Sequence, residues 1–407
     1  MLRPTRRFLL LVCIALLAPI AAQADVALDW LSTSEEATAK LGGRTDRARA
    51  IAWLAAFNAL DAIDPRYQPY APAPAPVPVP SAGLRPSTDA ALAAAIYTAL
   101  VVEPDADQAL LVRRYRETLA SVKSAPEREA GAILGQQAAL MLLAARSADR
   151  LGRVEPPTRE AAAGVFVAPG YAKMPRSIVI TRLTPFGVRS VDAFDPGPPP
   201  ALGSDVAARE IAETRSLGSI MSTARSGDQS GAAVFWNSGD PSDFSSMLKT
   251  LLEPRKLEPL DVARMLALDA MISVDDNIVN TTFKERYAHW RPESAIAGPF
   301  AAAADRDPDW QSLVRVPNSP QYPSGGGNFA GVFEVEMPRL FGVAGPIEWR
   351  NSQTGQARRW PSAAQAADEI ASSRIWAGVH FRSAVDAGRR VGRQIATEIL
   401  DRQLLAR

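Results

Sequence analysis

Residues 258–291 read EPLDVARMLALDAMISVDDNIVNTTFKERYAHWR, and this stretch decides the fold class of the chain. Apolar residues recur in it at helical spacing, with charged and polar residues between them, which is typical of an α-helix rather than a strand. Three further Ala- and Leu-rich tracts, at about 45–62, 87–148 and 361–404, have the same pattern, and alanine is the best helix former. The sequence therefore predicts an all-α protein, a large helical bundle.

Proline-rich segments interrupt these tracts. Residues 71–80, APAPAPVPVP, predict an extended polyproline stretch at the surface. Residues 151–205, which end in FDPGPPPALGS, predict an ordered loop that wraps over the helices. We therefore expect one helical domain over residues 25–407 with long Pro-rich loops. Its N-terminal half covers about 25–205, and its C-terminal half, about 206–407, carries the candidate site.

The first 24 residues are set apart by their composition. Three arginines precede the apolar run FLLLVCIALLAPIA, and Ala22-Gln23-Ala24 follows it. This order is that of a cleavable secretory signal, so we expect export to the periplasm or secretion. The run is shorter than the ~20 apolar residues that span a bilayer, which predicts no stable membrane anchor after the signal is removed.

Charge and cysteine content exclude several classes of function. The chain has 45 basic and 44 acidic residues and a formal net charge of +1, so no bulk electrostatic attraction to nucleic acid is expected. The single cysteine, Cys13, lies in the predicted signal. The mature chain is therefore expected to have no disulfide, no thiol catalysis and no Cys-ligated metal.

The first piece that carries chemistry is KERYAHWRP, residues 284–292. Lys284 and Arg291 are seven residues apart, so on a helix they share one face about two turns, or ~10.5 Å, apart and can converge on one ligand. Pro292 disfavours helical geometry at Arg291 and predicts a helix end there. The simpler interpretation is a solvated helix face.

The second piece is QYPSGGGNF, residues 321–329. Ser324 and the backbone N–H groups of Gly325, Gly326 and Gly327 could form an anion-binding nest at the start of a helix. The simpler interpretation is a glycine-rich turn.

The third piece is SRIWAGVHF, residues 373–381, with Arg374 and His380. The sequence has only two histidines, His289 and His380, which excludes metal sites built from several histidines. A lone histidine on an apolar helix is also compatible with a satisfied core residue.

Together, Lys-x6-Arg-Pro, Pro-Ser-Gly and Ser-Arg-x5-His, in this order, resemble the vanadium-dependent haloperoxidases and the type 2 phosphatidic acid phosphatases. The resemblance to the bacterial haloperoxidase-like branch covers most of the predicted mature chain. It extends to VDAFDPGPPPALGSDVA (191–207), IAETRSLGSIMSTARSGDQS (211–230), AAVFWN (232–237) and WRPESAI (290–296).

The resemblance implies a role for each matching residue. Lys284, Arg291 and Arg374 would neutralise the oxygens of vanadate or phosphate, which suits the planar fork of arginine. Ser324, with the backbone at Gly325 and Gly326, would bind further oxygens. His380 would be the metal ligand to vanadium in a haloperoxidase, or the nucleophile in a phosphatase. Vanadate and phosphate have nearly the same shape and charge, so the donors do not choose between them.

Two positions depart from the family pattern. Gly326 stands where the family has an acid–base histidine, and Ala384 where the phosphatases have an aspartate that orients the apical histidine. Asp386, two residues on, is expected to point away from the face of His380. A positioned acid or base contributes ~10²–10⁴-fold in rate, so these departures argue against an efficient phosphatase. They also predict that Gly326→His raises activity.

Three neighbouring residues are candidates to replace the missing acid or to support the site. His289 is predicted to point to another helix face than Lys284 and to pack beside Trp290. Asp275 and Asp276 are predicted to support the site residues or to face solvent.

Three functions stay open on the sequence. The first is an exported vanadate-dependent haloperoxidase-like enzyme that oxidises halide with hydrogen peroxide, the vanadate centre activating the peroxide. The second is an acid phosphatase-like phosphomonoesterase that uses His380. The third is an oxyanion-binding homologue with reduced or no turnover.

Overall fold

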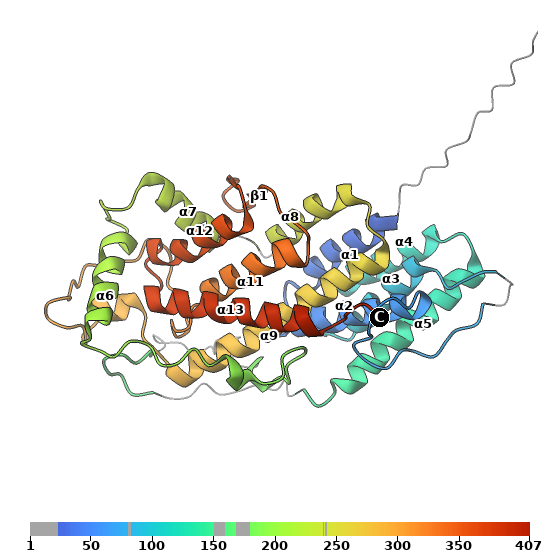
Figure 1. The fold of residues 1–407 in the computed structure, drawn as a ribbon, viewed down its shortest axis with the longest axis horizontal. Helices are drawn as coiled ribbons and strands as arrows, with labels where there is room; N and C mark the ends of the chain where they lie inside the picture. Colours follow the sequence, from blue (N-terminus) through green and yellow to red (C-terminus); the bar gives the residue numbers. More distant parts are fainter. Residues whose placement is uncertain (1–22, 80–82, 150–158, 168–179, 239, 241) are drawn as a thin grey trace, which may run out of the picture.

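The computed structural model describes residues 23–79, 83–149, 159–167, 180–238, 240 and 242–407. Helices dominate this part of the chain (Figure 1), which confirms the predicted all-α class. They are α1 (Gln23–Thr38), α2 (Thr45–Ile63), α3 (Thr88–Val101), α4 (Gln108–Ser121), α5 (Ala125–Ala145), α6 (Asp205–Gly218), α7 (Gly227–Ser238), α8 (Ser242–Leu252), α9 (Pro259–Tyr287), α10 (Pro292–Ile296), α11 (Gly325–Arg339), α12 (Ala363–Trp376) and α13 (Arg382–Arg402). Strands β1 (Ile347–Arg350) and β2 (Ala357–Trp360) form an antiparallel hairpin.

The predicted helical tracts correspond to these elements, but two of them are divided. The 87–148 tract becomes α3, α4 and α5, and the 361–404 tract becomes α12 and α13. A side-chain cap marks the start of the first tract, where Ser87 accepts a hydrogen bond from the N–H of Ala90 (3.3 Å), and another marks its division between α3 and α4, where Asp107 accepts from the N–H of Leu110 (2.9 Å). Such caps satisfy N–H groups that a helix start leaves without partners.

The Pro-rich segments are irregular where they are described. Residues 71–79 form neither helix nor strand. The 151–205 segment lies partly outside the described residues, and its described part is mostly loop with the short 3₁₀ helix η3 (Val191–Phe194).

The long helix α9 connects the two ends of the molecule. In Figure 1, α1 to α5 gather at one end, α6 and α7 lie towards the other, and α9 runs between them. It packs on α2 and also on α11 and α13. One hydrophobic core runs through both regions and includes Trp53, Phe57, Phe283, Phe333 and Ile395. This shared core gives no test of the predicted division into two halves near residue 205, which stays a prediction.

Helices α11 and α13 cross at close range because both carry glycine at the contact. A β-carbon at Gly327 or Gly331 of α11, or at Gly388 or Gly392 of α13, would overlap a backbone oxygen of the facing helix. The close approach brings the start of α11 against the start of α13, where the N–H of Ser324 donates to the Ala384 carbonyl (2.9 Å). Two of the three sequence motifs meet at this crossing.

Asp275 differs from both expectations for it. Its side chain is fully buried and accepts hydrogen bonds from the N–H groups of Phe186 (2.6 Å), Gly187 (2.7 Å) and Val188 (2.8 Å). It therefore neither faces solvent nor contacts a site residue. It fixes the loop that precedes η3 to the surface of α9.

A group of acidic side chains lies between α1, α2, α9 and α11. Burial raises the pKa of Asp269 to about 7, and burial together with Asp269 and Asp276 raises the pKa of Glu336 well above its ordinary value. Glu35, Asp46 and Arg49 face the same group. These carboxyls are held close together with one arginine among them, so their charged forms are unfavourable in the folded protein.

Stability is therefore expected to fall as pH rises. The pKa of Asp269 is about 7 in the folded protein, above its ordinary value of 3.8. At a pH between these two values the folded protein therefore keeps a proton that the unfolded chain has released. The stabilisation is complete at acid pH and is lost as pH rises through the folded pKa, by at least roughly 2 kcal/mol. Urea unfolding at pH 5 and pH 8 measures it.

Glu336→Gln tests the contribution of one member of this group. It is expected to stabilise the protein at pH 8 and to change little at pH 5, where Glu336 already holds its proton. Glu334→Gln, on the same helix but in a surface ion pair with Arg389 (3.0 Å), serves as the control. Equal effects of Glu336→Gln at both pH values would contradict the assignment.

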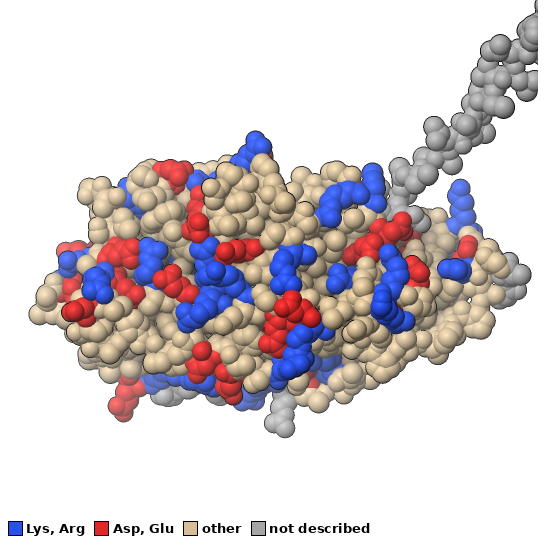
Figure 2. All heavy atoms as spheres, in the orientation of Figure 1, with Lys and Arg blue, Asp and Glu red and all other residues tan. Residues whose placement is uncertain are grey.

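Two surface features of the described chain complete the description. None of its helices combines the length and the apolar character needed to cross a membrane. Figure 2 shows Lys and Arg interspersed with Asp and Glu on the face in view, with no extended region of one sign. That pattern agrees with the near-neutral net charge.

Candidate oxyanion site

Lys284 lies in the last turn of α9, and its ammonium is fully enclosed. It donates hydrogen bonds to the carbonyls of Pro320 (2.7 Å) and Pro323 (2.6 Å), on the loop that leads into α11. Lys284 therefore reaches the Pro-Ser-Gly motif through its backbone.

Arg291 is not on the same helix as Lys284, so the predicted seven-residue helical spacing is wrong. Helix α9 ends at Tyr287, and Ala288 adopts a left-handed conformation with φ of 43°. The following residues pair with a distant loop instead, since the Ala288 carbonyl accepts from the N–H of Phe166 (2.7 Å) and the N–H of Trp290 donates to Gly164 (3.0 Å). Arg291 then precedes α10 in extended conformation.

The guanidinium of Arg291 joins the loop before α11 to the turn before α13. Nε donates to the Ser319 carbonyl (2.7 Å) and Nη2 to Ser319 Oγ (3.1 Å). Nη1 donates to the Val379 carbonyl (2.8 Å) and lies 3.1 Å from His380 Nε2.

Arg374, in the last turn of α12, is the least satisfied of the three cations. Nη1 donates to the Trp236 carbonyl (3.2 Å), while Nε is buried and has no hydrogen-bond partner within the described part of the chain. The side chain lies directly over Gly326, where an added β-carbon would be 2.6 Å from both Cδ and Nε of Arg374.

The three cations share one enclosed region without an acidic partner. None of them forms an ion pair with a carboxylate among the described residues. Burial, Arg291 and Arg374 hold the pKa of Lys284 well below its usual range. Burial and Arg374 lower the pKa of Arg291 to about 9, and burial lowers that of Arg374 to about 10. Uncompensated buried positive charge is costly, and a polyvalent anion relieves it.

Ser324 caps the N-terminus of α11, as the sequence predicted. Its Oγ accepts from the N–H of Gly327 (3.2 Å), and Gly325 and Gly326 form the first turn. The first N–H groups of a helix have no partner within it and carry the positive end of the helix dipole. This terminus therefore adds anion donors next to Lys284 and Arg374.

His380 lies in the turn between α12 and α13, not on a helix, so the helical angle used to place Asp386 does not apply. Gly378 allows this turn with φ of +77°, and Thr214 Oγ1 donates to the His380 carbonyl (3.4 Å). Ala384 is fully buried in the first turn of α13, and Asp386 is exposed. Neither supplies a carboxylate to His380.

Gln321 orients His380 instead, and the sequence analysis missed it. The Gln321 side-chain oxygen accepts from the N–H of Phe381 (3.3 Å), which fixes the orientation of the amide. The same oxygen lies 3.4 Å from His380 Nδ1, so Nδ1 carries the proton and Nε2 keeps its lone pair towards Arg291. Burial and the three cations keep the pKa of His380 well below its usual range. His380 is a neutral imidazole with Nε2 facing the cations.

His289 lies on the other side of the same glutamine. The side-chain nitrogen of Gln321 lies 2.7 Å from Nδ1 of His289. Because an amide nitrogen can only donate, His289 Nδ1 is the acceptor. Burial lowers the pKa of His289 to about 4, and its ring packs edge-on against Phe381. Thus Gln321 bridges the only two histidines of the sequence.

Replacing Gln321 by leucine is expected to lower turnover by roughly 10–100-fold, because an orienting partner of a ligand histidine has effects of that size. Gln321→Glu keeps an acceptor at His380 Nδ1 and raises the pKa of His380, so its activity should be retained with a pH profile displaced upward. Steady-state kinetics across pH measure both. Equal activity of Gln321→Leu and the native protein would contradict this orienting role.

Part of the chain matches a known family model. Residues 264–405 match the family model described as the VCPO second helical-bundle domain. This region holds all seven candidate site residues. This C-terminal part of the chain, about a third of its length, is therefore similar to that domain.

Solved structures share its fold. A bacterial vanadium-dependent iodoperoxidase has a TM-score of 0.78 at 19% identity and covers 94% of this chain and 97% of its own. The apo form of a bacterial vanadium-dependent chloroperoxidase has a TM-score of 0.67 at 16% identity, over 91% and 97% of the two chains. The holo form of such a chloroperoxidase has 0.63 at 17%, over 90% and 93%. No curated protein matches the sequence.

Within this vanadium-haloperoxidase fold, the structure explains the glycine at 326. The Arg374 side chain occupies the space that a residue with a β-carbon would need there. Gly326→His is therefore expected to displace Arg374 and to weaken phosphate binding by roughly tenfold or more, and not to raise activity as the sequence alone suggested. Calorimetric titration with phosphate measures the loss, and a gain in turnover would contradict it.

A relay of side-chain amides behind the candidate oxyanion site also escaped the sequence analysis. Asn280 donates to the Asn328 side-chain oxygen (3.1 Å), and Asn328 donates to Asp276 (2.7 Å). Asn280 also reaches the Pro323 carbonyl (3.4 Å) that accepts from Lys284. Asp276 thus supports the site through Asn328 and Asn280, and does not face solvent, which agrees with the first of its two predicted roles.

Proposed function

We propose that the chain is an exported oxyanion-binding enzyme that holds vanadate and oxidises halide with hydrogen peroxide. The observation that carries the proposal is the convergence of two buried cations, Lys284 and Arg291, and the half-buried Arg374 on one neutral histidine, without an ion-paired carboxylate in the described part of the chain. The donor set fits vanadate, since positive charge surrounds the imidazole Nε2 that would serve as ligand. Bound vanadate would supply a Lewis acid that activates hydrogen peroxide.

Each protein group has a task in this proposal. Lys284, Arg291 and Arg374 bind the oxyanion oxygens and neutralise their charge, and the start of α11 at Ser324, Gly325 and Gly326 adds N–H donors. Gln321 holds the His380 proton on Nδ1, so Nε2 is available. The fixed cations would also stabilise negative charge on oxygen atoms bound at the site.

The phosphomonoesterase alternative requires His380 to act as nucleophile towards a phosphate ester. Its neutral Nε2 is suited to attack, but the orienting partner is an amide. A carboxylate would stabilise the imidazolium that forms, and an amide does so less well. This contrast favours the peroxidase over the phosphatase.

One experiment separates the three functions. The mature protein is loaded with orthovanadate and given iodide or bromide with hydrogen peroxide, and triiodide formation or dye bromination is measured. Turnover that requires both vanadate and peroxide supports the proposal. Release of phosphate from a chromogenic ester, inhibited by vanadate, would instead support the phosphomonoesterase. Tight phosphate binding with neither halide oxidation nor ester hydrolysis would support the oxyanion-binding protein.

Export is part of the proposal and rests on the sequence of residues 1–24, which lie almost entirely outside the described residues. Amino-terminal sequencing of the protein recovered from a bacterial periplasm tests it. We expect a mature chain that begins near Asp25. If the protein is found only in the cytoplasmic fraction and still begins at Met1, the proposed export is wrong.

A further inference from the structure

A cavity of about 740 Å³ lies between α1, the start of α2 and the start of α8, and it shares no residue with the oxyanion site. Helices α1 and α8 pack side by side there (Figure 1). The wall of the cavity carries one cation, Arg49, and four carboxylates, on Glu35, Glu36, Asp46 and Asp240. Serine hydroxyls add further acceptors. The wall therefore has an excess of negative charge.

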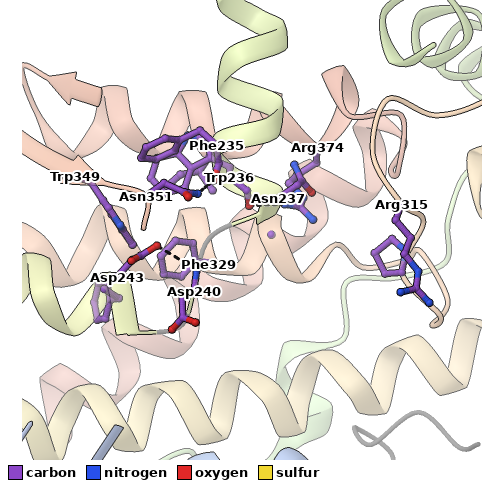
Figure 3. Close-up of a pocket in the computed structure, with 14 residues that line it drawn as sticks. Phe235, Trp236, Asn237, Asp240, Asp243, Arg315, Phe329, Trp349, Asn351 and Arg374 are labelled. Atoms are coloured by element: carbon purple, nitrogen blue, oxygen red, sulfur yellow. Dashed lines mark hydrogen bonds between the residues drawn. The ribbon is translucent and has the colours of Figure 1, made fainter. Parts of the chain in front are cut away.

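Arg49 compensates only one of these carboxylates. It forms an ion pair with Glu35, while Asp46 accepts a hydrogen bond from the neutral side chain of Asn277. Glu36 and Asp240 are exposed at the rim, and neither they nor Asp46 form an ion pair with a described residue. Figure 3, a view of the neighbouring cavity beside Arg374, shows the Asp240 carboxylate turned away from the aromatic rings there.

Two deeply buried carboxyls continue this negative region inward. Asp269 of α9 is 7% exposed and Glu336 of α11 is 2% exposed. Within the described part of the chain Asp269 has neither a hydrogen bond nor an ion pair, and Glu336 Oε1 is enclosed without a partner. Asp269 faces Arg49, Glu35 and Asp46 of the wall, and Glu336 faces Asp269. Buried polar groups normally have partners, so this arrangement indicates a cationic one.

The spacing of the carboxylates determines which cation fits. Among the described residues no three acidic or histidine side chains lie close enough together to hold a metal ion. The carboxylates are instead spread from the exposed rim to the buried interior of a large cavity. An aliphatic chain with ammonium groups at both ends matches such a distribution, because each ammonium has three N–H donors for carboxylate and hydroxyl oxygens.

We propose that this cavity binds an aliphatic diamine or polyamine. One ammonium group is held at the rim by Glu36 and Asp240. Another is held inside by Asp46 and Asp269, beside the ion pair of Glu35 with Arg49. The ligand replaces repulsion among the carboxylates by attraction to a cation. This site does not depend on the proposed function, because it uses none of the oxyanion-site residues.

The test is calorimetric titration of the mature protein with putrescine at pH 8, together with thermal unfolding of the ligand-free protein. Asp269→Asn is expected to weaken putrescine binding by roughly tenfold or more and to raise the unfolding temperature, because it removes a buried charge. A purely structural defect would lower both. Glu334→Gln, whose carboxylate forms a surface ion pair with Arg389 (3.0 Å), is the control and should leave binding unchanged.

Two further measurements do not depend on a core variant. Glu36→Gln, at an exposed position, is expected to weaken putrescine binding by roughly threefold or more.

Binding to the native protein should also be at least roughly tenfold weaker at pH 5 than at pH 8. Burial raises the pKa of the carboxyls on every helix around the interior, so they are less ionised at pH 5, whereas Asp240 stays charged: Glu35 on α1, Asp46 beside Arg49 on α2, Asp269 and Asp276 on α9, and Glu336 on α11.

Three results would overturn the proposal. The first is a putrescine signal that NaCl of equal ionic strength reproduces, which would be general screening of charge. The second is binding that Asp269→Asn and Glu36→Gln leave unchanged. The third is tighter binding of Mg²⁺ than of putrescine with the same dependence on these variants, which would make the cavity a metal site.

Discussion

Arg374→Met is expected to lower the affinity for phosphate or vanadate by roughly 100-fold, because it removes a buried charged donor from the anion. In the anion-free protein the same change should not lower stability and is expected to raise it by about 1 kcal/mol. Within the described residues its guanidinium makes one hydrogen bond (3.2 Å) and leaves Nε without a partner, and it repels Lys284 and Arg291. Methionine keeps the apolar stem and removes this repulsion.

The control for this variant is Arg225→Met. Arg225 is buried. Like Arg374 it has no carboxylate partner in the part of the chain that the structure describes, but its guanidinium donates to Ser230 Oγ (2.9 Å) and to the carbonyls of Leu217, Ser219 (2.9 Å) and Trp376 (3.1 Å). Its loss leaves several acceptors unpaired and is expected to destabilise the protein by about 2 kcal/mol or more. Thermal unfolding with and without phosphate measures both variants. A large destabilisation in Arg374→Met would show that Arg374 is a structural residue.

The sequence predicted the helical class because helical spacing is a local pattern, and the structure brings the seven candidate site residues of the three motifs together. Helical spacing in residues 258–291 specifies α9, and the Pro-Ser-Gly motif specifies the capped start of α11. The relative position of Lys284 and Arg291, which lie on different elements, could not be predicted from a local pattern. Pro292 indicated a helix end at Arg291, but α9 ends at Tyr287, where backbone pairing with residues 164–166 draws the chain away. That pairing joins segments more than a hundred residues apart and leaves no periodic signal.

Gln321 shows the same limit at the site itself. It stands in the quoted loop three residues before Ser324, yet nothing in QYPSGGGNF marks a glutamine as the partner of a distant histidine. Its role depends on the close α11–α13 crossing, which brings the loop against the turn at His380. The glycines that permit this crossing were visible, but the identity of the facing helix was not. Local chemistry is thus readable from sequence, whereas partners across the fold are not.

His380→Ala is expected to reduce turnover on the order of 10³-fold or more, as the loss of a central catalytic group does. Phosphate affinity should change less than tenfold, since Lys284, Arg291 and Arg374 remain and carry the charge. This split between turnover and binding separates a catalytic histidine from one that only supports the cations. Steady-state kinetics and calorimetric titration of the same preparation measure it.

His289→Ala is the matched control, because His289 is the only other histidine and touches the same glutamine from the opposite side. Its loss should reduce turnover far less, since it acts on His380 only through Gln321. Added imidazole provides a sharper test, because it fits the space left by the ring and offers a nitrogen in place of Nε2. Partial recovery in His380→Ala but not in Arg374→Met is expected, since a neutral ring cannot replace the charge. If His289→Ala and His380→Ala lose turnover equally, both histidines would instead act by holding Gln321 in place.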